Sequence, residues 1–292
     1  MNSKQFVQKI LEPADVRING DRPWDIKVND ERFYGRILAE GTLGAGESYV
    51  DGWWDAEELD ETVHRVTASG GVKKMKGKWA VLFLILKSKL LNMQTKRRSR
   101  KVARKHYDLG NDLYEAFLDP YNQYTCGYFK DTWDLNKAQE QKLDLTCRKL
   151  QLKPTDRVLD IGCGWGGFAK WAAEHYGCHV TGVSISDEQI SYARQLTAGL
   201  PVEIVKADYR DLKGSYDKVL VCGMIEHVGY KNYRTIMKVI RRLLRPGGLF
   251  LLHTIGRNDS VVSAEPWIEK NIFPNSMLPS PVQLTRASEG LF

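Results

Sequence analysis

The sequence predicts an α/β protein, in which a doubly wound parallel sheet follows a small, mainly helical N-terminal domain. Two observations carry this prediction. Strand-like and helix-like segments alternate from residue 136 onward, and a glycine-rich loop joins the first of these strands to the next helix. Alternation of this kind is typical of parallel sheets, because a helix is the usual crossover between parallel strands.

Residues 1–95 are expected to form the first domain, 96–105 a basic connector and 106–292 the second domain. Within the first domain, short strands are expected at 16–18 and 26–28, and helices at 30–40 and 59–68. A further helix is expected at 76–92, because Trp79, Phe83 and Leu86 recur there at helical spacing. Such a stripe is more typical of a core than of a membrane-inserted surface.

The second domain has its strands and helices in regular order. The expected helices are 137–150, 168–176, 187–197 and 230–244, and the expected strands are 157–161, 179–183, 202–205, 218–222 and 248–254. Ligands of open parallel sheets bind beyond the carboxyl ends of the strands, so functional side chains are expected just after each strand.

Composition and cysteine usage narrow the class of protein. The chain is 42% hydrophobic and 27% charged, which is typical of a globular protein. Its five cysteines include no CxxC pair, which favours free thiols in a reducing compartment. No secretory signal is apparent, and the longest apolar run, 79–86, is far shorter than the about 20 residues of a spanning helix. A cytoplasmic protein is therefore expected.

The positive charge is concentrated in one block. Residues 72–107 contain 13 Lys or Arg and no Asp or Glu, and subtracting these 13 charges from the formal +7 leaves −6 for the rest of the chain. Such a block can face nucleic acid, anionic lipid or solvent. No RNA-binding module is recognisable, so contact with a phospholipid surface is preferred to contact with nucleic acid.

The glycine loop follows the strand 157–161 and reads Asp160-Ile-Gly162-Cys-Gly164-Trp-Gly-Gly167. Its glycines allow a tight turn and a close approach to a ligand, and the following helix offers free N–H groups. The spacing also satisfies the dinucleotide fingerprint, but the next strand ends at Ser184 without the acid that would hold a ribose. The loop instead resembles motif I of the class I methyltransferases, with Asp160 organising it.

Several segments together carry a more specific resemblance. They are GESYVDGWW (46–54), HYDLGNDLY (106–114), QYTCGYF (123–129), VLDIGCGWGG (158–167), MIEHVG (224–229) and LLHTIG (251–256). The chain resembles the bacterial cyclopropane-fatty-acyl-phospholipid synthases and, more distantly, the mycolic acid cyclopropane synthases. The resemblance implies an S-adenosylmethionine-dependent transfer of a methylene to unsaturated phospholipid acyl chains. It also implies a homodimer, peripheral contact with the inner membrane and a lipid-associated N-terminal domain.

The resemblance also implies roles for individual residues. Those expected to contact S-adenosylmethionine are Tyr124, Thr125, Gly162, Gly164, Ser184, Gln189, Asp208 and Tyr209. Those expected to hold a bicarbonate ion are Cys126, Glu226, His253 and the backbone of Ile255. No metal is implied.

The expected chemistry explains these residue types. An isolated alkene cannot be activated by removing a proton, so a nucleophilic cysteine would not help, and Cys126 is expected to act through its backbone. Methyl transfer leaves a carbocation, which the face of an aromatic ring can stabilise. The candidates for this role are Tyr124, Tyr128, Phe129 and Trp267. Bicarbonate would remove the last proton, with His253 as donor and relay and Glu226 accepting the bicarbonate hydroxyl.

Two alternatives to a lipid-modifying enzyme stay open from the residues alone. The protein could be a methyltransferase acting on a polar molecule or RNA, or a fragment that binds lipid and cofactor without turnover.

His227 is expected to be structural, and a metal site at His175 and His179 is disfavoured by Gly177 between them. Two further strands and a bicarbonate-binding tyrosine are expected beyond residue 292. These residues alone are therefore expected to bind S-adenosylmethionine weakly and to turn over little.

Overall fold

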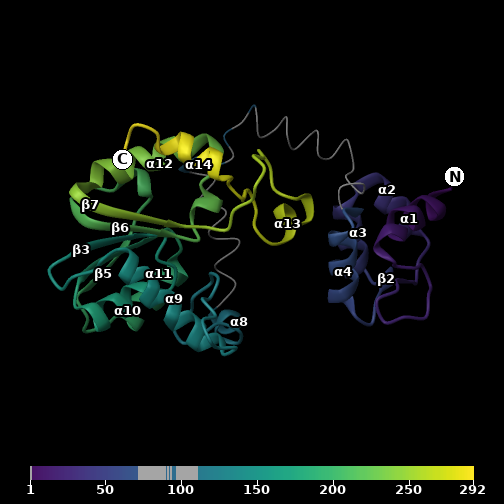
Figure 1. Ribbon diagram of the computed structural model, residues 1–292, viewed down its shortest axis with the longest axis horizontal. Coiled ribbons are helices and arrows are strands. Elements are labelled where there is room, and N and C mark those ends of the chain that lie inside the picture. The colour runs from purple at the N-terminus through teal and green to yellow at the C-terminus, as the bar shows by residue number, and fades with distance from the viewer. Residues whose placement is uncertain (1, 72–89, 91, 93, 97–110) are drawn as a thin grey trace. The chain divides into compact units, whose positions relative to one another are not determined.

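A computed structural model of the chain describes residues 2–71, 90, 92, 94–96 and 111–292. The chain divides into two compact units (Figure 1). The first unit comprises Met1–Leu91 and Ser263–Pro274, and the second comprises Asn92–Val262 and Asn275–Phe292. Almost all of the expected helix 76–92, most of the basic block and the start of the HYDLGNDLY segment lie outside the described residues.

The second unit contains a five-stranded sheet in the order β5-β4-β3-β6-β7. Its strands are β3 (Arg157–Ile161), β4 (His179–Ser184), β5 (Val202–Lys206), β6 (Tyr216–Cys222) and β7 (Leu244–His253). All four neighbouring pairs are parallel, so every carboxyl end reaches the same edge. The predicted α/β class and doubly wound sheet are confirmed.

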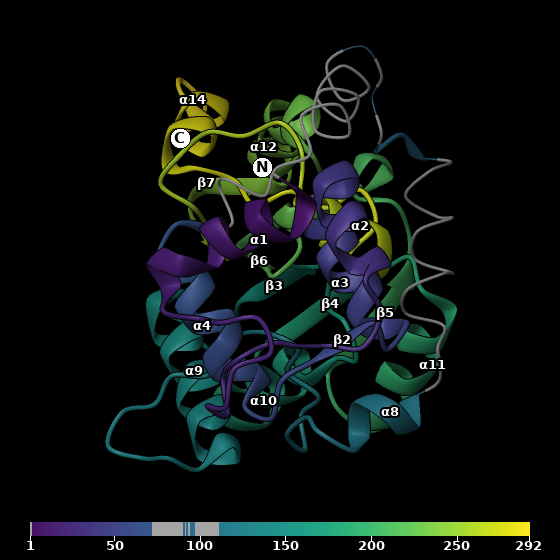
Figure 2. The same cartoon turned by 90° about the vertical axis from the view of Figure 1, so that its right-hand side faces the viewer.

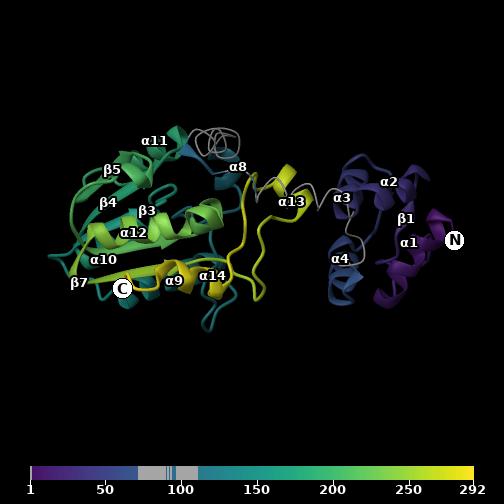
Figure 3. The same ribbon diagram turned by 90° about the horizontal axis from the view of Figure 1, so that it is seen from above.

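Helices cover both faces of this sheet. On one face lie α12 (Tyr233–Leu243) and α14 (Pro281–Ser288), and on the other α9 (Leu135–Lys149) and α10 (Gly167–Tyr176) (Figure 2). Seen from above, α12 covers the middle of the sheet (Figure 3). Ile236 and Ile240 of α12 are buried in the core on one face, while Leu143 and Cys147 of α9 are buried on the opposite face. The helix α11 (Asp187–Leu196) packs beside β4 and β5.

Two element boundaries in the second unit differ from prediction. The helix expected at 230–244 opens with a 3-10 turn, η4 (Tyr230–Asn232), before α12 begins. The last strand starts at Leu244 rather than 248, with a register irregularity opposite Tyr216 and Lys218. The register moves from Leu244 opposite Tyr216 to Leu249 opposite Lys218, so the Pro-Gly-Gly turn signal at 246–248 persists as an irregularity within the strand.

The first unit is mainly helical. Its helices are α1 (Ser3–Leu11), α2 (Arg32–Glu40), α3 (Thr42–Val50) and α4 (Leu59–Ala68), with a 3-10 turn η1 (Glu12–Ala14) and two short strands, β1 (Lys27–Val28) and β2 (Trp54–Asp55). Val7, Phe33, Ile37 and Trp54 lie in its core. The expected strands at 16–18 and 26–28 shrink to one bridge, Ile18 with Ile26, and to β1, which pairs antiparallel with β2.

Two helices of the first unit, α1 and α3, were not predicted from the sequence. The N-terminus of α1 is held by a capping box, in which Asn2 and Gln5 each accept the other's backbone N–H. The helix α3 contains two glycines, and its Ser48 hydroxyl donates back to the carbonyl of Gly44. Glycine and serine favour other conformations, so packing rather than propensity sets α3.

A third helix is also absent from the elements predicted from the sequence. The segment 263–274 forms α13 (Pro266–Asn271), which packs on α3 and therefore belongs to the first unit. Glu47 of α3 accepts a hydrogen bond from Asn271 at 2.8 Å and pairs with Lys270 at 2.9 Å. Trp267 packs so closely on Gly46 that an added Cβ would lie 2.3 Å from its ring. The expected single span 106–292 is thus interrupted by a segment that joins the first unit.

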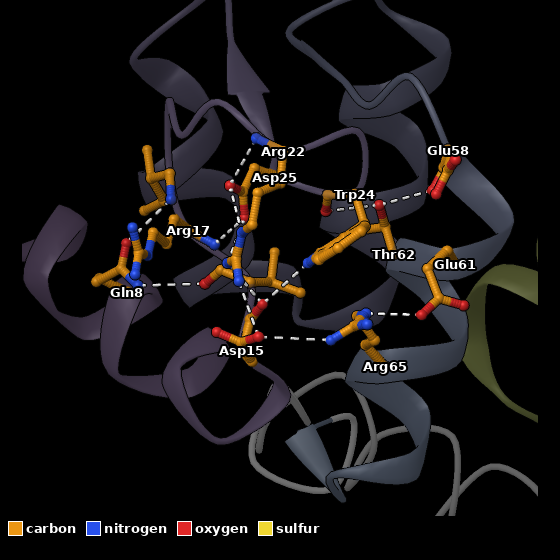
Figure 4. A network of polar contacts seen from close by, with 12 residues as sticks. Gln8, Asp15, Arg17, Arg22, Trp24, Asp25, Glu58, Glu61, Thr62 and Arg65 are labelled. Atoms are coloured by element: carbon orange, nitrogen blue, oxygen red, sulfur yellow. Dashed lines mark hydrogen bonds and ion pairs between the residues drawn. The ribbon is translucent and has the colours of Figure 1, made fainter.

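A buried carboxylate organises the loop between α1 and α2 (Figure 4). Asp25 is 1% exposed and accepts hydrogen bonds from the backbone of Arg17 at 2.8 Å and of Arg22 at 3.2 Å. The Arg22 guanidinium adds two bonds, at 3.0 and 2.9 Å, and also reaches Asp15. The Arg22 side chain, with these backbone bonds, lowers the pKa of Asp25 to about 2.

Replacing Asp25 by Asn is expected to lower the free energy of unfolding by about 2–3 kcal/mol, because an amide group would face donors that need an acceptor. The folded pKa of Asp25 lies below the ordinary 3.8. The contribution of the Asp25 carboxylate to the free energy of unfolding is therefore complete above about pH 4 and is lost as the pH falls toward about 2. Denaturant unfolding at several pH values should show the gap between wild type and Asp25→Asn closing in that window. Asp21→Asn, at an exposed site, is the matched control, and an equal effect of both variants would contradict the account.

Candidate active site

The predicted site residues gather along the carboxyl edge of the sheet. Gly162 and Gly164 follow β3, Ser184 ends β4, and Asp208 follows β5. Glu226 follows β6, and His253 ends β7. Because the strands are parallel, one continuous edge carries both the expected cofactor residues and the expected anion residues.

The glycine loop has the backbone that its sequence predicts. Gly162, Gly164 and Gly166 have φ values of 89°, 54° and 87°, in the left-handed region that favours glycine. An added Cβ at Gly167 would lie 1.9 Å from the carbonyl oxygen of Tyr121, so the segment before QYTCGYF rests directly on the loop. There is therefore no room for a side chain at Gly167.

The carboxyl group of Asp160 is buried at the end of β3. It is 2% exposed, and burial raises its pKa to about 7, while the positive charge of Lys142 opposes this rise. A buried carboxyl just before the glycine turn fits the expected role of organising the loop.

An aromatic cluster lies against the glycine loop. The Trp165 indole donates to Asn111 of α8 (Asn111–Glu115) at 2.8 Å, and its ring lies 4.6 Å from that of Tyr114. Tyr114 in turn meets the ring of Tyr124 at 5.5 Å. The end of the HYDLGNDLY segment thus connects the glycine loop to one of the expected cofactor residues.

Ser184 and Gln189, both expected to contact the cofactor, are hydrogen-bonded to each other. Both are buried, and the Ser184 hydroxyl donates to Oε1 of Gln189 at 3.0 Å. Ser186 caps α11 by accepting from the Gln189 backbone. The pair is fixed at the end of β4, where a ribose is expected.

Asp208 and Tyr209 lie at the turn after β5. Asp208 caps the 3-10 turn η2 (Tyr209–Asp211) by accepting from the backbone of Arg210 at 3.0 Å and pairs with the Arg210 guanidinium at 3.3 Å. The Tyr209 ring belongs to the core beneath α12, and its buried hydroxyl has no hydrogen-bond partner among the described residues. Both residues have structural contacts, and their expected place beside an adenine stays a prediction.

Glu226 ties the ends of β6 and β7 together. It lies in the 3-10 turn η3 (Ile225–His227) and is 7% exposed. Its Oε1 accepts the backbone N–H of Ile255 at 2.8 Å, and its backbone carbonyl accepts the N–H of Met277. Its Oε2 is buried and has no hydrogen-bond partner in the described part of the chain. An unsatisfied buried carboxylate oxygen is unfavourable unless a ligand donates to it.

His253 faces a thiol on the neighbouring strand. Its Nδ1 lies 3.3 Å from Sγ of Cys222, and the Cys222 Sγ lies 4.0 Å from Oγ1 of Thr125. Burial, followed by the positive charges of Lys142 and Lys149, lowers the pKa of His253. Burial also raises the pKa of Cys222 to about 11. The pair is therefore a neutral imidazole beside a neutral thiol at neutral pH.

The QYTCGYF segment carries exposed aromatic side chains. Tyr124, Tyr128 and Phe129 are 40%, 42% and 50% exposed, and Cys126 is exposed. Trp267, the fourth candidate for stabilising a carbocation, packs in the first unit instead.

Two residues of α9 that sequence reasoning missed hold this segment. Gln139 donates to the carbonyl oxygens of Gln123 and Thr125 at 3.2 and 2.8 Å. Lys142 donates to the Gln123 side chain and, at 2.9 Å, to Oγ1 of Thr125. A signal existed, because both polar residues share the helix face of the apolar Ala138 and Leu143.

The described residues suggest neither a metal site nor a membrane span. No group of three or more His, Cys, Asp or Glu side chains among them could hold a metal ion. His175 stacks on Trp171 at 3.9 Å. No helix within the described ranges is both long and apolar enough to cross a bilayer.

Together, the parallel sheet, the glycine turn and the buried acid before it define a class I methyltransferase fold. The family model for mycolic acid cyclopropane synthetase matches residues 94–291, and the chain belongs to that family.

Individual relatives agree with the family match. The cyclopropane-fatty-acyl-phospholipid synthase of Escherichia coli K12 is 46% identical over 291 residues, which cover 100% of this chain and 76% of that protein. A tuberculostearic acid methyltransferase of Mycobacterium tuberculosis is 35% identical, over 84% of this chain and 61% of that protein. The solved mycolic acid cyclopropane synthase CmaA1, complexed with SAH and CTAB, matches with a TM-score of 0.60 and 31% identity, over 64% of this chain and 72% of that one.

Proposed function

We propose that this enzyme transfers a methylene from S-adenosylmethionine to the cis double bond of unsaturated phospholipid acyl chains, forming a cyclopropane ring. The observation that carries the proposal is the buried Glu226 carboxylate, which is fixed by Ile255 and keeps one oxygen for which the described residues supply no donor. The E. coli relative with 46% identity, whose name gives this activity, supports it.

The glycine turn fits S-adenosylmethionine. An added Cβ at Gly164 would meet nothing within 4 Å, so there is open space beside the backbone at this turn, while Gly162 is packed against the Met224 side chain. Gly162 and Gly164 would hold the amino-acid end, Ser184 and Gln189 the ribose, and Asp208 with Tyr209 the adenine. Tyr124 and Thr125 would contact the sulfonium. When bound, the cofactor supplies an electrophilic methyl group.

Glu226 and His253 fit a bicarbonate ion, which when bound would supply the base. The Oε2 of Glu226 is an acceptor that a bicarbonate hydroxyl could satisfy. A neutral His253 can donate through one ring nitrogen and relay a proton through the other. The backbone of Ile255 was expected to help hold the ion, and its N–H group already donates to Glu226. We therefore infer that Ile255 contributes chiefly by fixing the carboxylate.

The protein's task in this chemistry is alignment and exclusion of water. An alkene reacts with the methyl group only when the two are aligned, and positioning contributes much of such a rate enhancement. The carbocation must be kept from water, for which Tyr124, Tyr128 and Phe129 offer aromatic faces. The contacts from Gln139 to Gln123 and Thr125 hold the segment that carries these rings.

Replacing Cys126 by Ser is expected to leave most of the turnover, because the proposed contact uses the backbone of Cys126 rather than its sulfur. Steady-state kinetics with unsaturated phospholipid vesicles would measure this. Complete inactivity of a folded Cys126→Ser protein would contradict the proposed role and favour a nucleophilic thiol.

We also propose that the enzyme works at the surface of an anionic bilayer, as a homodimer in the cytoplasm. The basic block at 72–107 supports surface contact, since each Lys or Arg near an anionic surface contributes about 1 kcal/mol. Binding of this kind is reversible and weakens as salt rises.

The proposal is tested by incubating the protein, produced from its own gene, with S-adenosylmethionine and vesicles of unsaturated phospholipid. Mass spectrometry of the lipids should show acyl chains that have gained one methylene. Vesicles of saturated phospholipid are the matched control and should stay unchanged. Modification of RNA or of polar small molecules, with unsaturated lipid untouched, would overturn the proposal.

A further inference from the structure

Lys142 is a buried cation that the proposed chemistry leaves without a role. It lies in α9 and is only 5% exposed. Two other basic side chains of α9 form ion pairs at its surface, Lys137 with Glu140 and Arg148 with Asp144. The Lys142 ammonium instead donates to an amide and a hydroxyl, those of Gln123 and Thr125. A buried ammonium with neutral partners is costly, so its presence calls for a reason.

The partners of Lys142 lie in the segment that carries the expected cofactor and anion contacts. Tyr124 lies between Gln123 and Thr125, and Cys126 follows them. Gln139, one turn earlier on α9, donates to the backbone carbonyls of Gln123 and Thr125. On either side of Tyr124, Lys142 therefore bonds to the side chains of Gln123 and Thr125, and Gln139 bonds to their backbone carbonyls.

Lys142 is connected to the ends of β6 and β7 by a chain of polar contacts and interacts electrostatically with Asp160 at the end of β3. Thr125, which accepts from Lys142, lies 4.0 Å from the Cys222 thiol at the end of β6, and that thiol lies 3.3 Å from His253 at the end of β7. Further groups that interact electrostatically with Lys142 are Asp160 of β3, Asp119 and Cys126. Asp119 is occupied by the backbone N–H groups of Tyr121 and Gln123.

We propose that Lys142 is a positioning residue of the active site, which locks Gln123 and Thr125 onto α9 and holds a positive charge behind Asp160, Cys222 and His253. The inference rests on the proposed function only in taking cyclopropane formation as the reaction of this site. The lock fixes Tyr124 and Cys126, and the charge favours the neutral form of His253 that a proton relay needs.

The charge has a measurable consequence for its neighbours. The positive charge of Lys142 adds to burial in lowering the pKa of His253. It opposes the burial that raises the pKa of Asp160. Burial lowers the pKa of Lys142 itself from the ordinary 10.5. Removing the charge should therefore raise the pKa of His253, because imidazolium would no longer face a second cation.

The test compares Lys142→Met and Lys142→Gln with Lys137→Met, which removes an exposed lysine of the same helix. The pKa of His253 is measured by NMR in protein without cofactor or lipid, with its resonance identified among six histidines by a His253→Asn variant. Both Lys142 variants should raise this pKa, and Lys137→Met should not. Turnover should fall by about tenfold or more in Lys142→Met, with a lower kcat and a higher KM for S-adenosylmethionine, because the segment that shifts carries Tyr124 and Thr125. Lys142→Gln, which keeps a donor, should lose less.

An unchanged pKa of His253, with wild-type turnover in a folded Lys142→Met protein, would overturn the proposal. If neither variant folds, the wild-type protein decides the matter by itself. A titration of ¹³C-labelled lysines should then show Lys142 with a pKa below 10.5, and an ordinary value would contradict its burial against the site. These measurements need no lipid, so failure of the proposed reaction would appear separately, as a wild-type protein that forms no cyclopropane.

Discussion

Replacing Glu226 by Gln is expected to lower turnover by about 10²-fold or more, which is the typical loss when one preorganised polar group of an active site is removed. Glutamine matches the shape of glutamate, so one side-chain oxygen can still accept the Ile255 N–H. The NH₂ group then takes the place of the buried Oε2, which has no partner among the described residues, and the negative charge of the carboxylate is lost. The proposed base would then meet a donor where it needs an acceptor.

The same variant should bind S-adenosylhomocysteine nearly as well as wild type, since Glu226 contacts the ends of β6 and β7 rather than the glycine loop. Calorimetry and steady-state turnover together would show this separation of binding from chemistry. Glu203→Gln, at an exposed position of β5, is the matched control. Turnover close to wild type in Glu226→Gln would contradict the assignment of the anion site.

Replacing Gly167 by Ala is expected to reduce both cofactor binding and turnover, by about 10²-fold for a displacement on the order of 1 Å. The added Cβ would lie 1.9 Å from the Tyr121 carbonyl oxygen and 2.9 Å from its carbon. These are backbone atoms, so they cannot rotate away as a flexible side chain would. The displaced chain leads within a few residues to Tyr124 and Thr125.

Gly35→Ala is the control for this substitution. Gly35 lies inside α2, and an added Cβ there meets nothing within 4 Å. Alanine at such a site should be neutral or slightly stabilising. Binding of S-adenosylhomocysteine by a folded Gly167→Ala protein at wild-type affinity would show that the loop does not need this close approach.

The sheet and its functional edge could be predicted because their signals are local. Each strand is a short apolar run, and the residue types with chemical function follow directly at its end, as Gly162 does after β3 and Glu226 does after β6. The rule for open parallel sheets then brings residues far apart in sequence to one edge. The predicted strand β3 agrees with the structure at both ends.

The elements that were missed depend on partners that the sequence does not indicate. The helix α3 has glycines and a weak pattern, and α13 is only six residues long, yet they pack on each other through Glu47, Lys270 and Asn271. The functional contacts of Gln139 and Lys142 were missed for a related reason. Polar residues on the inner face of a helix have meaning only once their acceptors, Gln123 and Thr125, are known.

The most direct test of the central claim uses S-adenosylmethionine with a fully deuterated methyl group and a phospholipid with one cis double bond. Ring closure requires that the transferred methyl lose one hydrogen. We predict that mass spectrometry and NMR of the lipid will show a cyclopropane carbon that retains two of the three deuterium atoms. A methyl branch that retains all three, or no change in the lipid, would contradict the claim that this site closes a cyclopropane ring.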